Sequence, residues 1–211
     1  MADADNLLRD AIAAERRDLA AVLADLPAQM WDAQTLCAGW RPREVVAHMT
    51  MPYRYSTPRV LAELVRARGN FNKMADRCAR RDAAALSAAE LAASLASNAS
   101  NPWKPPGGGY EGALTHDVVH GLDFTVPLRI GRKVPEDRVR VVLRGLCTPR
   151  GLKYFGVDLS GIELSADDMD WTFGSGTPVH GAAQDLVLVL AGRKLPAGQL
   201  SGEPSARFTH A

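Results

Sequence analysis

Hydrophobic side chains recur every three or four positions over the first two thirds of the chain, which is the period of helices with one buried face. Several of these segments open with a proline in the first turn or with a capping residue, and several stop at glycine or proline. The expected helices are 5–26, 43–49, 57–69, 87–95, the segment around 114–123, and 138–146. The charged stretch 15–18 of the first is expected on a solvated face, and the second is expected to end before Pro52.

The last 60 or so residues change to a different pattern. Ile162 and Leu164 alternate with polar neighbours, and so do the apolar residues of 169–173, which predicts two strands. Gly and Pro in 174–178 predict a turn, and 181–192 reads as a helix closed by glycine. The sequence therefore predicts a mainly α protein, with a four-helix bundle in residues 1–150 and a small α+β unit in residues 151–211.

Composition narrows the class of partner. Among 211 residues, 46% are hydrophobic and 23% charged, and the formal net charge is +1, so neither nucleic acid nor a membrane is the expected partner. Cys37, Cys78 and Cys147 are widely spaced and odd in number, which argues against a disulfide framework. With no apolar leader or spanning segment, the expected location is the cytoplasm.

His116 and His120 are the first candidates for chemistry. Four residues apart on a helix, they project from the same face, while Leu114, Val118 and Leu122 form an apolar stripe on another side. Two imidazoles at this spacing can chelate one divalent ion. The alternative is two partly exposed helix histidines without a ligand role, so a third ligand is needed.

His48 is the candidate third ligand. It lies on or beside the core face of its helix with Val45 and Met49, where a histidine is either a satisfied core residue or a ligand. The loop 101–110 leads directly into the helix of the paired histidines. Trp103 and Tyr110 are candidates to line the site, unless the loop is only a flexible connection.

Three segments carry a resemblance to a known family. They are Gly39-Trp40 followed by Glu44-Val45-Val46-Ala47-His48, then His120-Gly121-Leu122-Asp123, and then the tail from Trp171-Thr172-Phe173-Gly174 to Leu190-Ala191-Gly192-Arg193. They resemble the DinB-like superfamily and, within it, the mycothiol-dependent maleylpyruvate isomerase family of actinobacteria. The resemblance implies a DinB-type bundle with a metal held among its helices.

By resemblance, His48 and His120 are metal ligands. The isomerases have a glutamate where this chain has His116, and three histidines are common in the wider DinB-like group. The metal expected is Zn²⁺ or another divalent transition metal, without a charged ligand and therefore strongly Lewis-acidic. The family's cosubstrate is mycothiol, a small thiol that a metal can hold as thiolate for attack on a small electrophile.

Three further residues have two interpretations each. Asp123 is a candidate to orient a metal ligand, or it caps the helix end. Arg193 is a candidate to bind a carboxylate of substrate or thiol, or it is a surface residue near a helix C-terminus. Cys37 is expected to be a small buried hydrophobe rather than a nucleophile.

The sequence leaves three functions open. The first is a metal- and mycothiol-dependent transferase or isomerase acting on a small electrophilic substrate. The second is a metal-dependent hydrolase that uses bound water and no thiol. The third is a metal- or ligand-binding stress protein without turnover.

Overall fold

A computed structural model describes residues 2–210, which form two compact units. The first unit runs to His120 and the second begins at Gly121. The domain boundary near residue 150 that the sequence suggested stays a prediction. The structure assigns residues 121–150 to the second unit, in which the helix Glu136–Leu146 packs against the C-terminal helix Ala183–Leu190.

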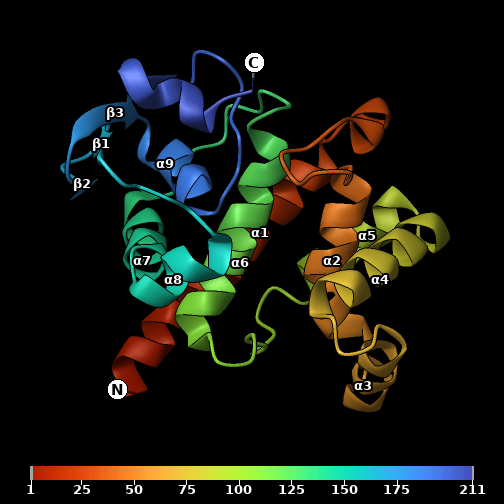
Figure 1. The fold of residues 1–211 in the computed structure, drawn as a ribbon. Helices are drawn as coiled ribbons and strands as arrows, with labels where there is room; N and C mark the ends of the chain where they lie inside the picture. The colour runs from red at the N-terminus through yellow and green to blue at the C-terminus, as the bar shows by residue number, and fades with distance from the viewer. Residues whose placement is uncertain (1, 211) are drawn as a thin grey trace. The chain divides into compact units, whose positions relative to one another are not determined.

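Within residues 2–120, the first unit is built from helices (Figure 1). They are α1 Ala2–Ala24, the 3₁₀ helix η1 Ala28–Asp32, α2 Pro42–Arg54, α3 Thr57–Arg66, α4 Phe71–Ala85, α5 Ala88–Ser97 and α6 Gly109–Thr125, whose last turn belongs to the second unit. Helix α2 packs against α4 and α5, and α1 packs against α5. This arrangement buries the apolar stripes predicted from the sequence, including Leu114 and Val118 of α6 at 0% exposure.

Helix α2 does not end before Pro52, as the sequence had suggested, but continues to Arg54. Proline removes only its own N–H from the helical ladder. The bonds around it persist, since the Tyr55 N–H donates to the Met51 carbonyl at 3.0 Å and the Thr50 hydroxyl donates to the Val46 carbonyl at 2.7 Å. The prediction that Pro52 ends the helix is therefore wrong, because a proline in the last turn does not terminate it.

The charged stretch of α1 is a second correction. Arg17 and Asp18 are exposed as expected, but Glu15 and Arg16 are completely buried. Arg16 lies four residues after Ile12, on the apolar face of the helix, and it is buried because Asp117 of α6 neutralises its charge.

The second unit combines helices with a small sheet (Figure 1). Its remaining elements are α7 Glu136–Leu146, α8 Pro149–Phe155, β1 Ile162–Ala166, β2 Thr172–Gly174, β3 Thr177–Gly181, α9 Ala183–Leu190, β4 Leu200–Ser201 and the 3₁₀ helix η2 Glu203–Phe208. The sheet order is β2-β1-β3-β4, with β1 parallel to β3 and the other pairs antiparallel. The predicted strands β1 and β2 and the helix α9 are confirmed.

Pro178 lies in strand β3 rather than in the predicted turn. The N–H of the preceding residue, Thr177, donates to the Gly161 carbonyl at 2.9 Å, so the nitrogen of Pro178 points to the other side of the strand. There, β4 pairs only with His180 and Gly181, and no hydrogen bond of the ladder is lost.

The mainly α architecture with a small α+β unit is thus the observed fold class. None of the helices within residues 2–210 is long and apolar enough to cross a membrane.

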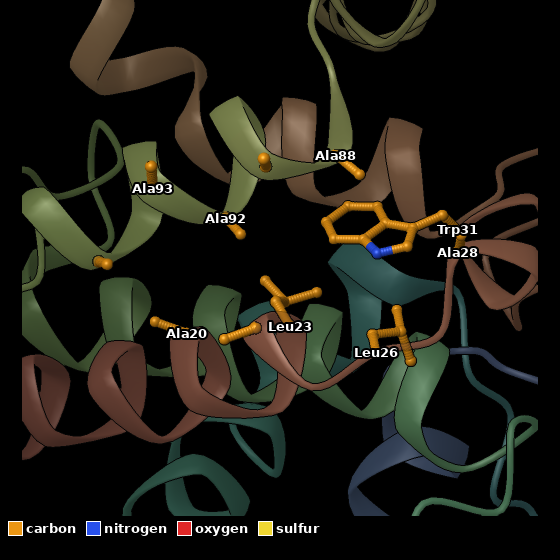
Figure 2. Close-up of a pocket in the computed structure, with 11 residues that line it drawn as sticks. Ala20, Leu23, Leu26, Ala28, Trp31, Ala88, Ala92 and Ala93 are labelled. Carbon is orange, nitrogen blue, oxygen red and sulfur yellow. The ribbon is translucent and has the colours of Figure 1, made fainter.

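An apolar cavity of about 450 Å³ lies between α1, η1 and α5 in the first unit. Figure 2 shows Ala20, Leu23 and Leu26 on one side of it and Ala92 and Trp31 on the other. Its lining is alanine, leucine and one tryptophan, with no charged side chain to orient a reactant. Side chains that could carry out chemistry are found instead at the histidines.

Candidate metal centre

The helix start of α2 places His48. Pro42 occupies the first turn, and the Arg41 N–H donates to the Glu44 carboxylate at 2.8 Å, which satisfies a donor that the helix leaves unpaired. Six residues into the helix, His48 is buried at 9% exposure beside the fully buried Val45 and Met49. The prediction that His48 lies on the core face is therefore confirmed.

The three histidines come together in the first unit. His116 and His120 follow each other by one turn of α6, with ring centroids 4.8 Å apart, and the ring of His48 lies 5.1 Å from His116 and 4.9 Å from His120. One ligand nitrogen from each ring lies within 4.8 Å of the others. This is the only cluster of three or more such groups within residues 2–210.

The donor set fits a divalent transition metal. The Nε2 atoms of His48 and His116 are 3.2 Å apart. Two nitrogens bound to one tetrahedral Zn²⁺ at about 2.0–2.1 Å would lie about 3.4 Å apart. Burial, followed by the charges of His120 and His116, holds the pKa of His48 well below its ordinary value. A neutral imidazole keeps the lone pair that a metal needs.

His116 has a carboxylate partner on its other ring nitrogen. Its Nδ1 lies 2.9 Å from Oδ1 of Asp117, which is completely buried. The second oxygen of Asp117 accepts from Nε of Arg16 at 2.7 Å. By contrast, the buried Nδ1 of His48 has no hydrogen-bond partner among the residues described.

Two tryptophans flank the histidines. Trp40 lies 5.1 Å from His48 and 6.4 Å from His120 by ring centroids, and Trp103 meets His116 edge-on at 5.2 Å. The Trp40 indole N–H donates to Asp76 at 2.8 Å, which fixes the ring. The predicted role of Trp103 as lining is consistent with its position.

Gly39 allows the chain to place Trp40. Its φ of 74° lies in the left-handed region that favours glycine, and its carbonyl accepts from Arg80 at 3.0 Å. Arg80 also donates to Asp76, so one short network holds both Gly39 and the Trp40 ring.

The other predicted site residues have different partners. Tyr110 contacts the cations of Lys104 and Arg9, at 4.5 and 6.0 Å from its ring centroid. In the second unit, Asp123 is completely buried and accepts from Nε and Nη2 of Arg193 at 2.7 and 2.9 Å. Arg193 is therefore half-buried in an ion pair rather than a surface residue, while substrate binding by it and ligand orientation by Asp123 stay predictions.

Cys37 is only partly buried, contrary to the expectation of a buried residue. Its backbone N–H donates to the Thr35 hydroxyl at 3.2 Å, and that hydroxyl donates to the Trp40 carbonyl at 2.8 Å. The segment forms a hydrogen-bonded turn, which does not need a buried side chain at Cys37.

Sequence reasoning missed four residues around the histidines: Arg16, Tyr53, Asp117 and, as a lining residue, Trp40. A signal existed for Arg16, because Ile12, Arg16, Leu19 and Leu23 share one helical stripe. The buried hydroxyl of Tyr53 has no hydrogen-bond partner in the described part of the chain, and burial and the charge of Asp117 raise its pKa. No local pattern marks Tyr53 or Asp117.

Together, the fold and the site define the class: a helical protein with a three-histidine candidate metal centre assembled from two helices. Residues 12–101 match the mycothiol maleylpyruvate isomerase N-terminal domain family. This matched segment lies within the first unit and agrees with the family that the sequence resemblance named.

Solved structures agree on the fold. The crystal structure of the mycothiol-dependent maleylpyruvate isomerase matches with a TM-score of 0.60 and 12% identity, covering 95% of this chain and 93% of that chain. A histidine-to-alanine mutant of the isomerase matches over the same shares, with a TM-score of 0.57 and 12% identity. No protein of curated function matches the sequence significantly.

Proposed function

We propose that this chain is a metal-dependent enzyme that uses a small thiol, mycothiol. It either transfers the thiol to a small electrophilic substrate or isomerises that substrate. The observation that carries the proposal is the convergence of His48, His116 and His120 on one point. Two of these ligands, His116 and His120, lie just beyond the segment that matches a mycothiol-dependent isomerase domain, and the fold of that isomerase extends over them.

The chemistry follows from the donor set. Three neutral imidazoles leave a tetrahedral ion one open position and its full positive charge. A divalent ion there would lower the pKa of a bound thiol, so that the thiol reacts as thiolate at neutral pH. The chain itself supplies the orientation of the ligands and, from Trp40 and Trp103, two flat apolar surfaces beside the reacting groups.

The substrate class follows from the thiolate. A soft sulfur nucleophile suits an electrophilic carbon, such as one conjugated to a carbonyl group. Release of the adduct gives transfer, whereas rotation about the former double bond and loss of the thiol gives isomerisation. The cytoplasm, where small thiols are kept reduced, remains the expected location.

Elemental analysis tests the metal first. Protein purified without chelator or histidine tag should hold about one equivalent of zinc or another transition metal, by analogy with three-ligand sites. His48→Ala, His116→Ala and His120→Ala should each lose it, whereas Cys37→Ala should keep it as the matched control. If the histidine variants retain metal like the parent, the site assignment is wrong.

Turnover then tests the thiol. The metal-loaded protein should convert small electrophiles only when mycothiol is added. Activity with metal alone would identify a hydrolase instead. Metal binding without turnover on any electrophile would favour a binding protein.

A further inference from the structure

Asp117 connects a buried arginine to one of the candidate metal ligands. Its side chain and that of Arg16 are both 0% exposed, and Oδ2 accepts from the Arg16 Nε at 2.7 Å. Oδ1 lies 2.9 Å from Nδ1 of His116. The two oxygens of one carboxylate thus serve two different partners, 101 and one residue away in the sequence.

We infer that Asp117, held by Arg16, is a positioning residue that fixes the tautomer and ring orientation of His116. An ionised carboxylate only accepts hydrogen bonds, and a guanidinium only donates them. Arg16 donates to this carboxylate, so the carboxylate is the acceptor toward His116 as well, and Nδ1 of His116 carries the proton. The lone pair of His116 is then on Nε2, the atom that lies 3.2 Å from Nε2 of His48. This inference rests on the metal site proposed above.

Arg16 also anchors the loop that carries Trp103, the aromatic neighbour of His116. Its Nη1 donates to the Asn101 carbonyl at 2.7 Å, and at 3.4 Å to that of Ala99. The Asn101 side chain in turn accepts the N–H of Trp103 at 3.0 Å, and the Trp103 ring packs edge-on against His116. One guanidinium therefore anchors both the hydrogen-bond partner and the aromatic neighbour of this ligand.

The substitution Asp117→Asn tests the tautomer directly. The asparagine has one accepting oxygen and one donating NH₂ group. Because Arg16 can only donate, the oxygen is expected to face Arg16 and the NH₂ group to face Nδ1 of His116. The proton of His116 then moves to Nε2, where it blocks the ligand lone pair.

The first readout is zinc affinity, measured by competition with a chromophoric chelator. Loss of a carboxylate that orients a metal-bound histidine typically weakens binding about 10- to 100-fold, and we expect this range for Asp117→Asn. The matched control is Asp82→Asn, which removes another buried carboxylate, one whose partners are Arg54, Arg81 and Tyr55. The control should bind zinc like the parent.

A double variant covers the case in which Asp117→Asn does not fold. Arg16→Met with Asp117→Leu removes both charges together, which buried ion pairs often tolerate. It also takes away the acceptor of His116, so zinc binding should again weaken about 10- to 100-fold. Parent-like affinity in either variant overturns the inference, and so does an equal loss in Asp82→Asn, because the effect would then be general.

The second readout is the tautomer of His116 in the metal-free parent, from long-range ¹H–¹⁵N NMR spectra assigned with His116→Ala. We expect the proton on Nδ1, and a proton on Nε2 overturns the inference. This measurement needs neither metal nor a substituted Asp117. If the parent binds no zinc but shows the Nδ1 tautomer, the proposed function fails while the orienting role of Asp117 stands.

Discussion

The buried His48 should make the metal-free protein less stable as the pH falls. Burial lowers the pKa of this imidazole well below its ordinary value of about 6.5, and the charges of His120 and His116 add to the effect. Between the lowered pKa and 6.5, the unfolded chain binds a proton at His48 that the folded chain excludes. The free energy of unfolding therefore keeps its full value above about pH 6.5 and decreases below it.

The size of this loss in the free energy of unfolding follows from the binding of one proton to His48 in the unfolded chain. Each pH unit below 6.5 costs at most about 1.4 kcal/mol while His48 stays neutral in the folded state. Integrated from pH 7.5 to 5.5, with an unfolded pKa of 6.5, the loss attributable to His48 is at most about 1.4 kcal/mol. This is a substantial share of the 5–15 kcal/mol, roughly, by which domains are stable.

Urea unfolding at several pH values, with chelator present to remove metal, measures this loss. The control is His48→Gln, which keeps a polar side chain of similar size but cannot titrate. The parent should lose more free energy of unfolding than the variant over this interval, by up to about 1.4 kcal/mol. If the two proteins lose the same free energy of unfolding, His48 is not held neutral by its surroundings and the electrostatic reasoning is refuted.

Three other substitutions have clear expected effects on urea unfolding at pH 7. Arg16→Met leaves the buried Asp117 without its counter-ion and should cost about 3–5 kcal/mol, and a loss below 1 kcal/mol would mean that water reaches the carboxylate. Ser87→Ala removes the cap of α5, in which the hydroxyl accepts the Glu90 N–H at 3.2 Å, and should cost about 1 kcal/mol. Leu186→Ala opens a cavity at a fully buried position in the second unit and should cost about 2–5 kcal/mol, whereas a smaller loss would indicate that the unit collapses around it.

The sequence by itself determined what depends on neighbours along the chain. The pairing of His116 with His120 follows from helical spacing, and the capping box at Ser87 follows from residue types three positions apart. The amphipathic stripes likewise predicted most of the helices, though not α4 or α8, and the strands β1 and β2. Such features are local, because backbone geometry fixes the relative positions of residues a few steps apart.

Only the tertiary structure decided which residues far apart in the sequence contact one another. His48 joins His116 across 68 positions, and Arg16 meets Asp117 across 101. A charged residue on an apolar stripe contradicts the helical pattern as long as its partner is unknown. Only a neutralising contact offsets the free-energy cost of burying the charge. The sequence could therefore nominate three histidines, but only the folded chain brings their nitrogens together and places a buried Arg–Asp pair beside one of them.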